Sequence, residues 1–504
     1  MCIDNFSLDP AHYITLPSFA FDAMLKVTDI KLELFSDIDK YLFCEKGIRG
    51  GICSIMHRYS KANNKYLSDY NSAEPSKYIL YIDKNSLYPE AMLNPLPYRD
   101  FNWINLDSVN FDKDTIMKLS PTGTFGFIFE VDLEYPPNLH DKHNEYPLAP
   151  DHLTITKKML SEYNNSVNNS FSKCEKLTPN LYAKSHYICH YRNLQFYLEK
   201  GLTLLRVHRA LRFKQACWME PYISKCARLR KNATSSFDKN LYKLLMNATF
   251  GKFMENVRNR MEFKFVNTKR KAENLIAKPS YRKFTQFDDN LFGIELIKTK
   301  INLNRPIYVG FSILDISKFL MYSFHYDHIK IEYPGIKSRL LFTDTDSFCY
   351  EFQTEDVYLD MKKNKHLFDF SDYPRDHPLQ NDDNKKKIGA FKDETLSIPI
   401  REFVGICPKV YSILIDNDSN KSTMKGITYA SSKNINHNHY RDCLFNSSSK
   451  YVKMLSIRSK DHNISTISTN KLALDPFDSK RYLLLDGIES RAYGHYLDCE
   501  NNYD

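Results

Sequence analysis

The chain has 504 residues, of which 42% are hydrophobic and 14% aromatic. These proportions exclude disorder along the whole length, because a disordered chain has too little apolar surface to bury, and the length allows two to four subdomains. Seventy basic against 61 acidic residues leave a net charge of +9, a surplus that suits a polyanionic partner and is also found in many ordinary proteins.

Cysteine spacing and hydropathy exclude further classes. The eleven cysteines include no CxxC pair, so neither a zinc ribbon nor a disulfide framework is indicated. The sequence has no N-terminal signal peptide and no run of 18 apolar residues. We therefore expect a soluble, intracellular protein without a membrane partner, in the nucleus, an organelle or a viral replication site.

The first segments are predicted to be helical and then to turn. Residues 1–45 have apolar side chains at helical spacing, and they are followed by Arg49-Gly50-Gly51. Two adjacent glycines beside an arginine let the backbone approach a ligand closely, and a nucleic-acid phosphate is one candidate. A simple tight turn is the alternative.

Strand patterns follow. Residues 78–82 are apolar and aromatic, which predicts a strand that ends at Asp83 and leads into Ser86-Leu87-Tyr88-Pro89. Residues 126–131 predict another strand, and residues 135–150 predict a loop rich in proline and histidine.

Two helices are expected next. The first covers about 214–231, and the second begins after Ser235, which has capping-box spacing to Asp238. In the second helix one stripe holds residues spaced four apart, which are Lys239, Lys243, Asn247 and Gly251. Such a stripe is often only a solvated face, but lysines above metal-binding aspartates would also offset the charge of a triphosphate.

The second half of the chain carries an acidic hairpin. Residues 257–306 are basic and irregular, which predicts a hairpin or arm, and residues 309–330 predict a long supporting helix. Residues 342–347 read as a hairpin turn that carries Asp344 and Asp346; an ordinary polar turn is the alternative. Together with Asp83, these carboxylates could hold two divalent ions for phosphoryl or nucleotidyl transfer.

The last recognisable pattern is a strand at residues 411–415, which residues 407–411 open. Lys409 and Tyr411 lie two apart there, so they are expected to share a face of the strand. The final ninety residues are mixed and polar and predict no clear element.

These segments together resemble family B DNA polymerases, specifically the protein-primed viral and organellar branch. The resemblance rests on ordered motifs: Arg49-Gly50-Gly51; motif A, Asp83 with Ser86-Leu87-Tyr88-Pro89; motif B, Lys243 to Asn247-Ala248-Thr249-Phe250-Gly251; motif C, Thr343-Asp344-Thr345-Asp346-Ser347; and the Lys-x-Tyr motif, Lys409-Val410-Tyr411. It spans about residues 8 to 500.

The resemblance implies roles for these residues. Asp83 and Asp346 would bind two Mg²⁺ ions, for which Mn²⁺ could substitute, with Asp344 nearby as a third catalytic carboxylate. The incoming deoxynucleotide would be bound by residues of motifs A and B, which are Ser86, Leu87, Tyr88, Lys239, Lys243, Asn247 and Phe250. Tyr88 would stack under the sugar and exclude ribonucleotides. Template and primer DNA would contact Arg49, Gly50, Gly51, Gly251, Thr343, Ser347, Lys409 and Tyr411.

The resemblance also implies the architecture, an α+β right-hand polymerase fold with an antiparallel palm sheet, helical fingers and a small thumb. The expected divisions are a helical segment at 1–48, palm at 49–205 and 307–405, fingers at 206–257, a basic arm at 258–306 and thumb at 406–504. The segments at about 130–190 and 257–306 sit where this branch carries insertions for a terminal priming protein and for strand displacement.

The chain departs from the family pattern in three places. Motif B has Ala248-Thr249-Phe250-Gly251 where Ser-x-Tyr-Gly is usual, and the two lost hydroxyls cost about 0.5–1.5 kcal/mol each, a tuning effect. Motif C begins with Phe342-Thr343 where Tyr-Gly is common. Fewer than fifty residues precede Arg49, whereas the family carries a 3′–5′ exonuclease there, so we expect no proofreading.

Two alternatives to an active DNA polymerase are considered. One is a catalytically silent, nucleic-acid-binding remnant with the same fold. The other is a reverse transcriptase, whose usual signature is an adjacent aspartate pair, whereas Thr345 separates Asp344 from Asp346 here.

Overall fold

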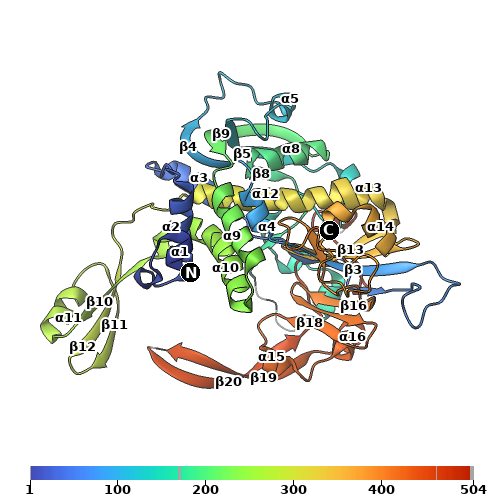
Figure 1. Ribbon diagram of the computed structural model, residues 1–504. Helices are drawn as coiled ribbons and strands as arrows, with labels where there is room; N and C mark the ends of the chain where they lie inside the picture. The colour runs from blue at the N-terminus through green and yellow to red at the C-terminus, as the bar shows by residue number, and fades with distance from the viewer. Residues whose placement is uncertain (1, 168–170, 172, 461, 500–504) are drawn as a thin grey trace.

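A five-stranded antiparallel sheet lies at the centre of the computed structural model, which describes residues 2–167, 171, 173–460 and 462–499 (Figure 1). Its order is β1-β13-β14-β3-β15, with bounds Cys53–Ile55, Ser338–Asp344, Ser347–Gln353, Lys77–Lys84 and Phe391–Asp393. The strand predicted at 78–82 and the hairpin predicted at 342–347 are therefore neighbours in one sheet, and an antiparallel sheet with helices is confirmed.

A long apolar helix supports this sheet. Helix α12 (Ile307–Ser323) continues into a π-helix, η5 (Phe324–Ile329), and α13 (Lys330–Glu332), as residues 309–330 predicted. The whole stretch is long and apolar enough to cross a membrane, but 83% of its most apolar window is buried inside the protein. It is therefore placed as a core helix, with Phe324 packed against Phe391 and Phe348 of the sheet.

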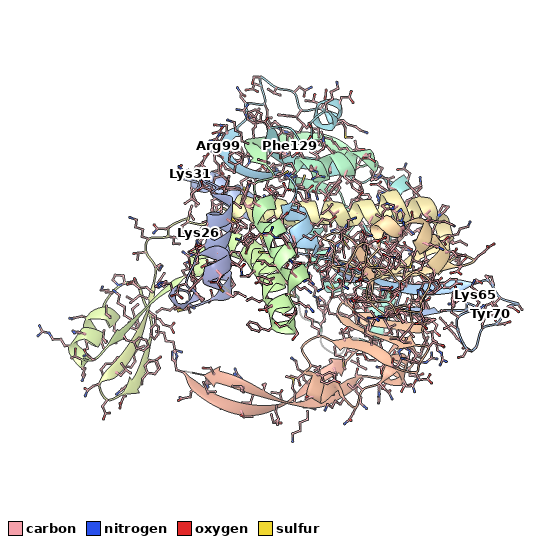
Figure 2. The ribbon with its side chains drawn as sticks, in the orientation of Figure 1. Lys26, Lys31, Lys65, Tyr70, Arg99 and Phe129 are labelled. Carbon is pink, nitrogen blue, oxygen red and sulfur yellow. The ribbon has the colours of Figure 1, made fainter. Side chains whose placement is uncertain are left out.

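A four-stranded antiparallel sheet lies above α12 in Figure 1. Its order is β4-β9-β5-β8, with bounds Leu96–Trp103, Thr203–Ala216, Phe125–Glu134 and Lys184–His190, and α8 (Tyr191–Glu199) follows β8. Strand β5 was predicted and buries Phe129 completely (Figure 2). The helix predicted from 214 begins only at Glu220, because residues 214–216 complete β9 by pairing with β4.

Helices α9 (Glu220–Asn232) and α10 (Ser236–Phe253) pack against each other and against the N-terminal α2. The cap of α10 forms as predicted, since the Ser235 hydroxyl accepts a hydrogen bond from Asp238 N at 3.0 Å. Leu245 and Met246 are buried, whereas Leu244 is 52% exposed. The N-terminal region is helical with breaks: α1 (Cys2–Phe6), α2 (Leu16–Thr28) and α3 (Ile38–Lys46).

The C-terminal part contains a second sheet, in the order β18-β17-β16-β2. Its bounds are Asn420–Met424, Val410–Ile415, Ile400–Cys407 and Tyr59–Lys61, and α16 (His437–Phe445) covers it. A long hairpin, β19 (Lys450–Lys460) and β20 (Asn463–Leu474), extends beneath α9 and α10 in Figure 1. The strand predicted at residues 411–415 forms as β17, but Cys407 ends β16 and Lys409 lies in the turn before β17 with a left-handed φ of 68°, so Lys409 and Tyr411 do not share a strand face as predicted.

The segment predicted to be a hairpin or arm is a small ordered unit, in which β11 and β12 form a hairpin. It consists of α11 (Lys269–Ile276) and a three-stranded sheet, β10-β12-β11, with bounds Met261–Val266, Leu291–Ile297 and Tyr281–Asp288. Its aromatic side chains meet the tip of the β19–β20 hairpin, where the ring centroid of His462 lies 4.8 Å from Phe287 and 6.0 Å from Phe263.

The remaining elements are short. A loop between β2 and β3 projects from the body and carries Lys65 and Tyr70 (Figure 2). The other elements are α4 (Leu87–Met92), α5 (Lys113–Met117), α6 (His140–His143), α7 (Glu162–Val167), α14 (Val357–Lys363), α15 (Tyr429–Ser432), α17 (Tyr496–Cys499), β6 (Asp151–Thr154), β7 (Glu175–Thr178), β21 (Tyr482–Leu483), β22 (Ser490–Arg491) and the 3₁₀ turns η1 (Pro10–His12), η2 (Pro137–Leu139), η3 (Lys157–Met159), η4 (Val257–Asn259), η6 (Gly335–Lys337) and η7 (Lys365–Leu367).

Candidate active site

The acidic ends of β3 and of the β13–β14 hairpin meet at one edge of the central sheet. Asp83 is in register with Ser347, and Ser347 in turn is in register with Asp344. The amide of Lys84 donates a hydrogen bond to the carbonyl of Asp346 at 2.7 Å, so the backbones of motifs A and C are joined directly. The structure therefore brings together carboxylates that are about 260 positions apart in the chain.

The electrostatics of these carboxylates reflect their crowding. Burial, followed by the negative charges of Asp346 and Glu394, raises the pKa of Asp83 to about 7. Burial is also the main cause that raises the pKa of Asp346, and the charge of Asp344 adds to it. Lys243 acts in the opposite direction on both Asp83 and Asp346. Uncompensated negative charge therefore collects here, and a divalent cation would relieve it.

Asp344 is placed differently from the other two. Its carboxylate forms an ion pair with Lys409 at 3.0 Å, and its backbone is in register with Cys53 of β1. Among the described residues no group of three His, Cys, Asp or Glu side chains is arranged to hold a metal ion. Asp83 and Asp346 are therefore the two carboxylates available for a cation, a set that suits Mg²⁺ when substrate phosphates and water supply the other ligands.

An aromatic pair faces this edge from two helices. The rings of Tyr88 on α4 and Phe250 on α10 are stacked, with centroids 4.3 Å apart and planes 13° apart. Ser86 precedes α4 in a left-handed conformation with φ of 59°, and its hydroxyl accepts a hydrogen bond from Arg230 of α9 at 3.3 Å. Leu87 is 2% exposed and belongs to the core.

The polar stripe of α10 lies as predicted on the outer side of the helix. Lys243 is exposed, whereas Lys239 and Asn247 are half-buried. Gly251 is exposed, and a Cβ there would meet nothing within 4 Å. From this helix the charge of Lys243 acts on the carboxyl groups of Asp83 and Asp346, while Thr249 and Leu245 are buried.

The arginine of the Arg49-Gly50-Gly51 segment is held inside the protein. Arg49 is only 5% exposed: its guanidinium lies 3.8 Å from the ring centroid of Tyr187, donates to the carbonyl of Ile188 at 2.8 Å and pairs with Asp151 at 3.2 Å. We therefore revise the prediction that this guanidinium contacts the template, because its charge is already paired with Asp151 inside the protein.

The two glycines of this segment differ in the space around them. A Cβ on Gly51 would come within 2.4 Å of Oγ1 and 2.9 Å of Cβ of Thr345, the residue between the two aspartates of motif C. A Cβ on Gly50 would meet nothing within 4 Å. Gly51 thus permits close packing against the motif C turn, and Gly50 is the open position from which the backbone could reach a template.

The other residues predicted to contact DNA are largely internal. Thr343 is buried and its hydroxyl donates to the carbonyl of Ser347 at 3.0 Å. Tyr411 is 4% exposed: it stacks on Phe342 at 4.3 Å, and its hydroxyl lies 3.1 Å from that of Tyr81. Burial raises the pKa of Tyr411 to about 12. In this group Lys409, whose side chain is 51% exposed, and Gly251 are open to solvent.

Sequence reasoning assigned no role to three side chains that the structure brings to this site. Arg230 reaches motif A through Ser86. Glu394 and Lys421 form an ion pair and both act on the pKa of Asp83. In the sequence these three residues were marked only by their charge and by their position in or beside a predicted helix or strand.

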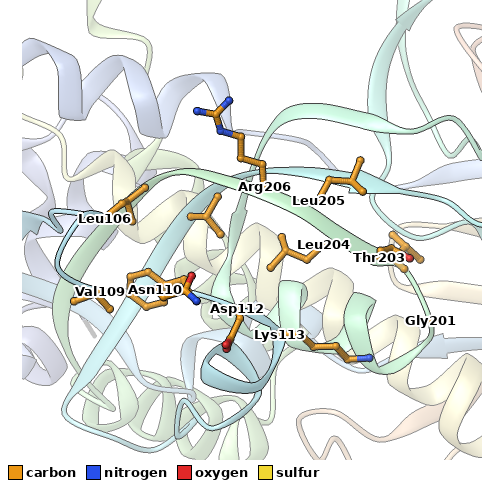
Figure 3. Close-up of a pocket in the computed structure, with 13 residues that line it drawn as sticks. Leu106, Val109, Asn110, Asp112, Lys113, Gly201, Thr203, Leu204, Leu205 and Arg206 are labelled. Atoms are coloured by element: carbon orange, nitrogen blue, oxygen red, sulfur yellow. The ribbon is translucent and has the colours of Figure 1, made fainter.

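A groove of about 650 Å³ lies elsewhere, between β9 and the segment that leads into α5 (Figure 3). Leu204, Leu205 and Arg206 line one side, and Val109 and Asn110 line the other. None of the predicted site residues lines it.

Comparisons with known proteins agree with this geometry. The sequence model of the family described as DNA polymerase type B, organellar and viral, matches residues 2–330. A search of the curated proteins finds no match.

Solved structures of Phi29 DNA polymerase are similar in fold. The ternary complex with primer-template DNA and incoming nucleotide substrates has a TM-score of 0.52 at 14% identity, covering 91% of this chain and 67% of that one. The orthorhombic crystal form gives 0.55 at 13%, covering 92% and 68%, and the post-translocation binary complex with primer-template DNA gives 0.54 at 15%, covering 93% and 69%. At these identities the likeness shows the fold, which is the right-hand polymerase fold.

Because the family match spans more than half of the chain and the carboxylate edge lies where motifs A and C meet, the protein belongs to the organellar and viral type B DNA polymerases, a family of DNA-directed DNA polymerases.

Proposed function

We propose that this chain catalyses template-directed transfer of deoxynucleotides to a primer 3′-hydroxyl by a two-metal mechanism. The observation that carries the proposal is the junction of Asp83 and Asp346: the amide of Lys84, next to Asp83, donates a hydrogen bond to the carbonyl of Asp346, and both carboxyl groups have raised pKa values. Two half-buried acids held together in this way are unfavourable unless cations share the site.

Asp83 and Asp346 would hold Mg²⁺, or Mn²⁺ in its place. When bound, the ions would lower the pKa of the primer hydroxyl and neutralise the leaving pyrophosphate. Asp344 is held by Lys409, and we propose that it shapes the site without being a principal ligand.

The nucleotide would lie between α4 and α10. Lys243 would offset triphosphate charge, a role supported by its effect on the pKa values of both aspartates. Asn247 and Phe250 would line the nascent base pair, and Tyr88, held by its stack on Phe250, would close the space that a 2′-hydroxyl needs.

Template and primer would run beneath α9 and α10. Lys409 would steady the primer terminus, with Tyr411 fixing its turn from inside, and Gly50 would lie against the template. The contact of His462 with the arm at 258–306 supports a role for the hairpin and the arm in retaining DNA. We further propose a terminal priming protein as a partner of the segment at about 130–190.

The proposed divisions are palm at 49–205 and 307–405, fingers at 206–257 and thumb at 406–504. The absence of proofreading stays a prediction, checked by incubating this chain with a 3′-mismatched primer and Mg²⁺ without nucleotides.

Primer extension with Mg²⁺ and deoxynucleotides tests the proposal. Wild type should extend a DNA primer on a DNA template, and Asp346→Asn should abolish extension while DNA affinity stays nearly intact. Asp376→Asn, at an exposed aspartate, is the matched control. Absence of incorporation by a folded, DNA-binding wild type would favour the silent remnant, and preference for an RNA template would favour a reverse transcriptase. Residual turnover of Asp346→Asn within tenfold of wild type would mean that the metal assignment is wrong.

A further inference from the structure

The three-stranded sheet of the arm has one covered face and one open face. Helix α11 contacts all three strands, and Phe292, Ile294 and Leu296 of the central strand β12 are buried on its side. Successive side chains of a strand point to opposite faces, so the alternate residues of β12 lie on the other side of the sheet. Because α11 is the one α-helix among the described residues of the arm, the arm itself leaves this second side, the open face, uncovered.

Aromatic rings gather on the open face. Phe265 of β10 is in register with Gly293 of β12, and Phe263, two residues earlier, shares its face. The ring centroids of Phe263 and Phe265 are 4.9 Å apart, and Phe287 of β11 joins them with its centroid 5.7 Å from that of Phe265. Phe265 is 64% exposed and Phe287 is 39% exposed. These three adjacent phenylalanines are called the aromatic platform below.

Gly293 lies at the centre of the platform. A Cβ at this position would come within 2.5 Å of Cζ of Phe263 and within 2.7 Å of Cε2 of Phe287. Glycine inside a strand weakens the strand and often marks a place where another group comes close to the backbone. Here the missing side chain lets rings from both edge strands approach each other over the central strand. The rings therefore form one continuous surface across the sheet.

The tip of the β19–β20 hairpin accounts for only part of this surface. His462 lies beside Phe287 and Phe263, with ring centroids 4.8 Å and 6.0 Å apart, and Figure 1 shows the hairpin tip next to the arm. Among the described residues, Phe265 has ring contacts only with the other two members of the platform. The contact with His462 therefore does not explain why the most exposed ring of the platform stands at position 265.

The charge of the arm favours a polyanionic ligand. Residues 258–306 include 12 basic and 5 acidic residues, so this short segment carries a net charge of +7 within a chain whose net charge is +9. On the open face itself Glu295 is in register with Lys283, and Asp288 stands at the end of β11. Aromatic rings on a sheet face stack on unpaired bases, and basic residues around them attract the phosphates of a single strand.

We propose that the aromatic platform binds single-stranded DNA, with Phe265 and Phe287 stacking on unpaired bases and the basic residues of the arm holding the phosphates. Duplex DNA would not be bound in this way, because its bases are already stacked on one another. The strand would lie next to the hairpin tip, since His462 contacts the same rings. This inference extends the retention of DNA proposed above, but it needs neither metal ions nor catalysis.

Fluorescence anisotropy with a labelled oligothymidylate of about 12 nucleotides, measured in EDTA, tests the platform on the full chain. Phe265→Leu keeps an apolar side chain but loses the ring, so it should weaken binding about tenfold, the loss expected for one stacked base. Phe265→Trp should retain the affinity. Phe284→Leu, at an exposed phenylalanine that stacks on Phe292 on the α11 side of the same sheet, is the matched control and should change the affinity little. Equal affinities of Phe265→Leu and Phe284→Leu would overturn the proposal.

A blunt duplex of the same length separates stacking from charge. Phe265→Leu should leave the affinity for the duplex nearly unchanged, and an equal loss for single strand and duplex would overturn the assignment. Sedimentation velocity checks a different occupant of the open face, a second copy of this chain. Self-association of the wild type that Phe265→Leu abolishes, with unchanged affinity for DNA, would show that the face is an interface between copies and that the proposal is wrong.

Photo-crosslinking of a strand that carries 5-iododeoxyuridine locates the bound bases. Crosslinks should include peptides that contain Phe265 or Phe287, and crosslinks confined to other parts of the chain would overturn the proposal. Oligothymidylate binding that depends on Phe265, in a wild type that extends no primer, would support the platform and refute the proposed function. A wild type that extends primers, together with a Phe265→Leu variant of unchanged affinity for the single strand, would overturn the inference alone.

Discussion

Substitution of Gly51 by alanine separates two explanations of the Arg49-Gly50-Gly51 segment. The added Cβ would lie 2.4 Å from Oγ1, 2.6 Å from Cγ2 and 2.9 Å from Cβ of Thr345, all closer than real Cβ contacts. Because the Cβ of Thr345 is attached directly to the backbone, side-chain rotation alone cannot relieve the clash. Overpacking of this kind costs about 1–3 kcal/mol.

The displacement would fall on the turn that carries Asp344 and Asp346. Thr345 has φ of 65° and its amide donates to the carbonyl of Ile52 at 2.7 Å, so the turn is anchored on the side from which Gly51→Ala pushes. A shift of a few tenths of an ångström should lower kcat roughly 3- to 10-fold, since a misplacement near 1 Å can cost about 100-fold. The effect should appear in kcat, with little change in DNA affinity.

Single-turnover extension and DNA binding, measured for Gly51→Ala and for the control Gly50→Ala, check this prediction. Gly50→Ala should keep the wild-type kcat because its Cβ would meet no protein atom within 4 Å, and any loss should fall on template affinity, since Gly50 is proposed to lie against the template. Thr345→Gly should rescue Gly51→Ala in a double-mutant cycle, because it removes the clashing atoms and suits the left-handed φ. Equal kcat values for the two alanine variants would refute the reasoning, and so would a loss confined to DNA affinity.

Three further predictions concern sugar selection, DNA retention and stability. Tyr88→Ala should admit ribonucleotides, and Phe250→Ala should do so more weakly because it loosens the stacked ring of Tyr88. Unchanged sugar selectivity in both variants would contradict the proposal that Tyr88 excludes ribonucleotides. His462→Ala should shorten the DNA made per binding event in the presence of a DNA trap, with single-nucleotide kcat unchanged, because the hairpin loses its contact with Phe287; equal product lengths would argue against it. Arg58→Met should lower the free energy of unfolding by about 2–4 kcal/mol in denaturant titrations. The reason is that the completely buried guanidinium of Arg58 donates hydrogen bonds to backbone carbonyls of three segments. A loss of less than about 1 kcal/mol, roughly the contribution of one hydrogen bond, would contradict this prediction.

The elements predicted best from the sequence are those specified by local pattern. The apolar run before Asp83 and the cap at Ser235 need only neighbouring residues, and both form as expected. The ordering of motifs also identified the two carboxylates that the sheet register joins, although Asp83 and Asp346 are far apart in the chain.

Long-range partners explain what could not be predicted. Arg49 is buried by Tyr187 and Asp151, more than 100 residues away, and no local feature distinguishes it from a phosphate-binding arginine. Tyr411 is covered by Phe342 in the same way. Residues 214–216 read as helix because a strand that alternates polar and apolar residues for only a few positions is ambiguous until its partner β4 is known.

The ring contact at the hairpin tip has a consequence for how DNA could enter. Aromatic pairs contribute about 0.5–1.5 kcal/mol each. The two ring contacts of His462 together therefore favour the form in which the hairpin tip touches the arm by about 1–3 kcal/mol. That corresponds to an open fraction of roughly one part in 5 to one part in 150. A contact of this strength would break and re-form many times while the protein searches for a primer end. DNA could therefore enter without unfolding of either the hairpin or the arm.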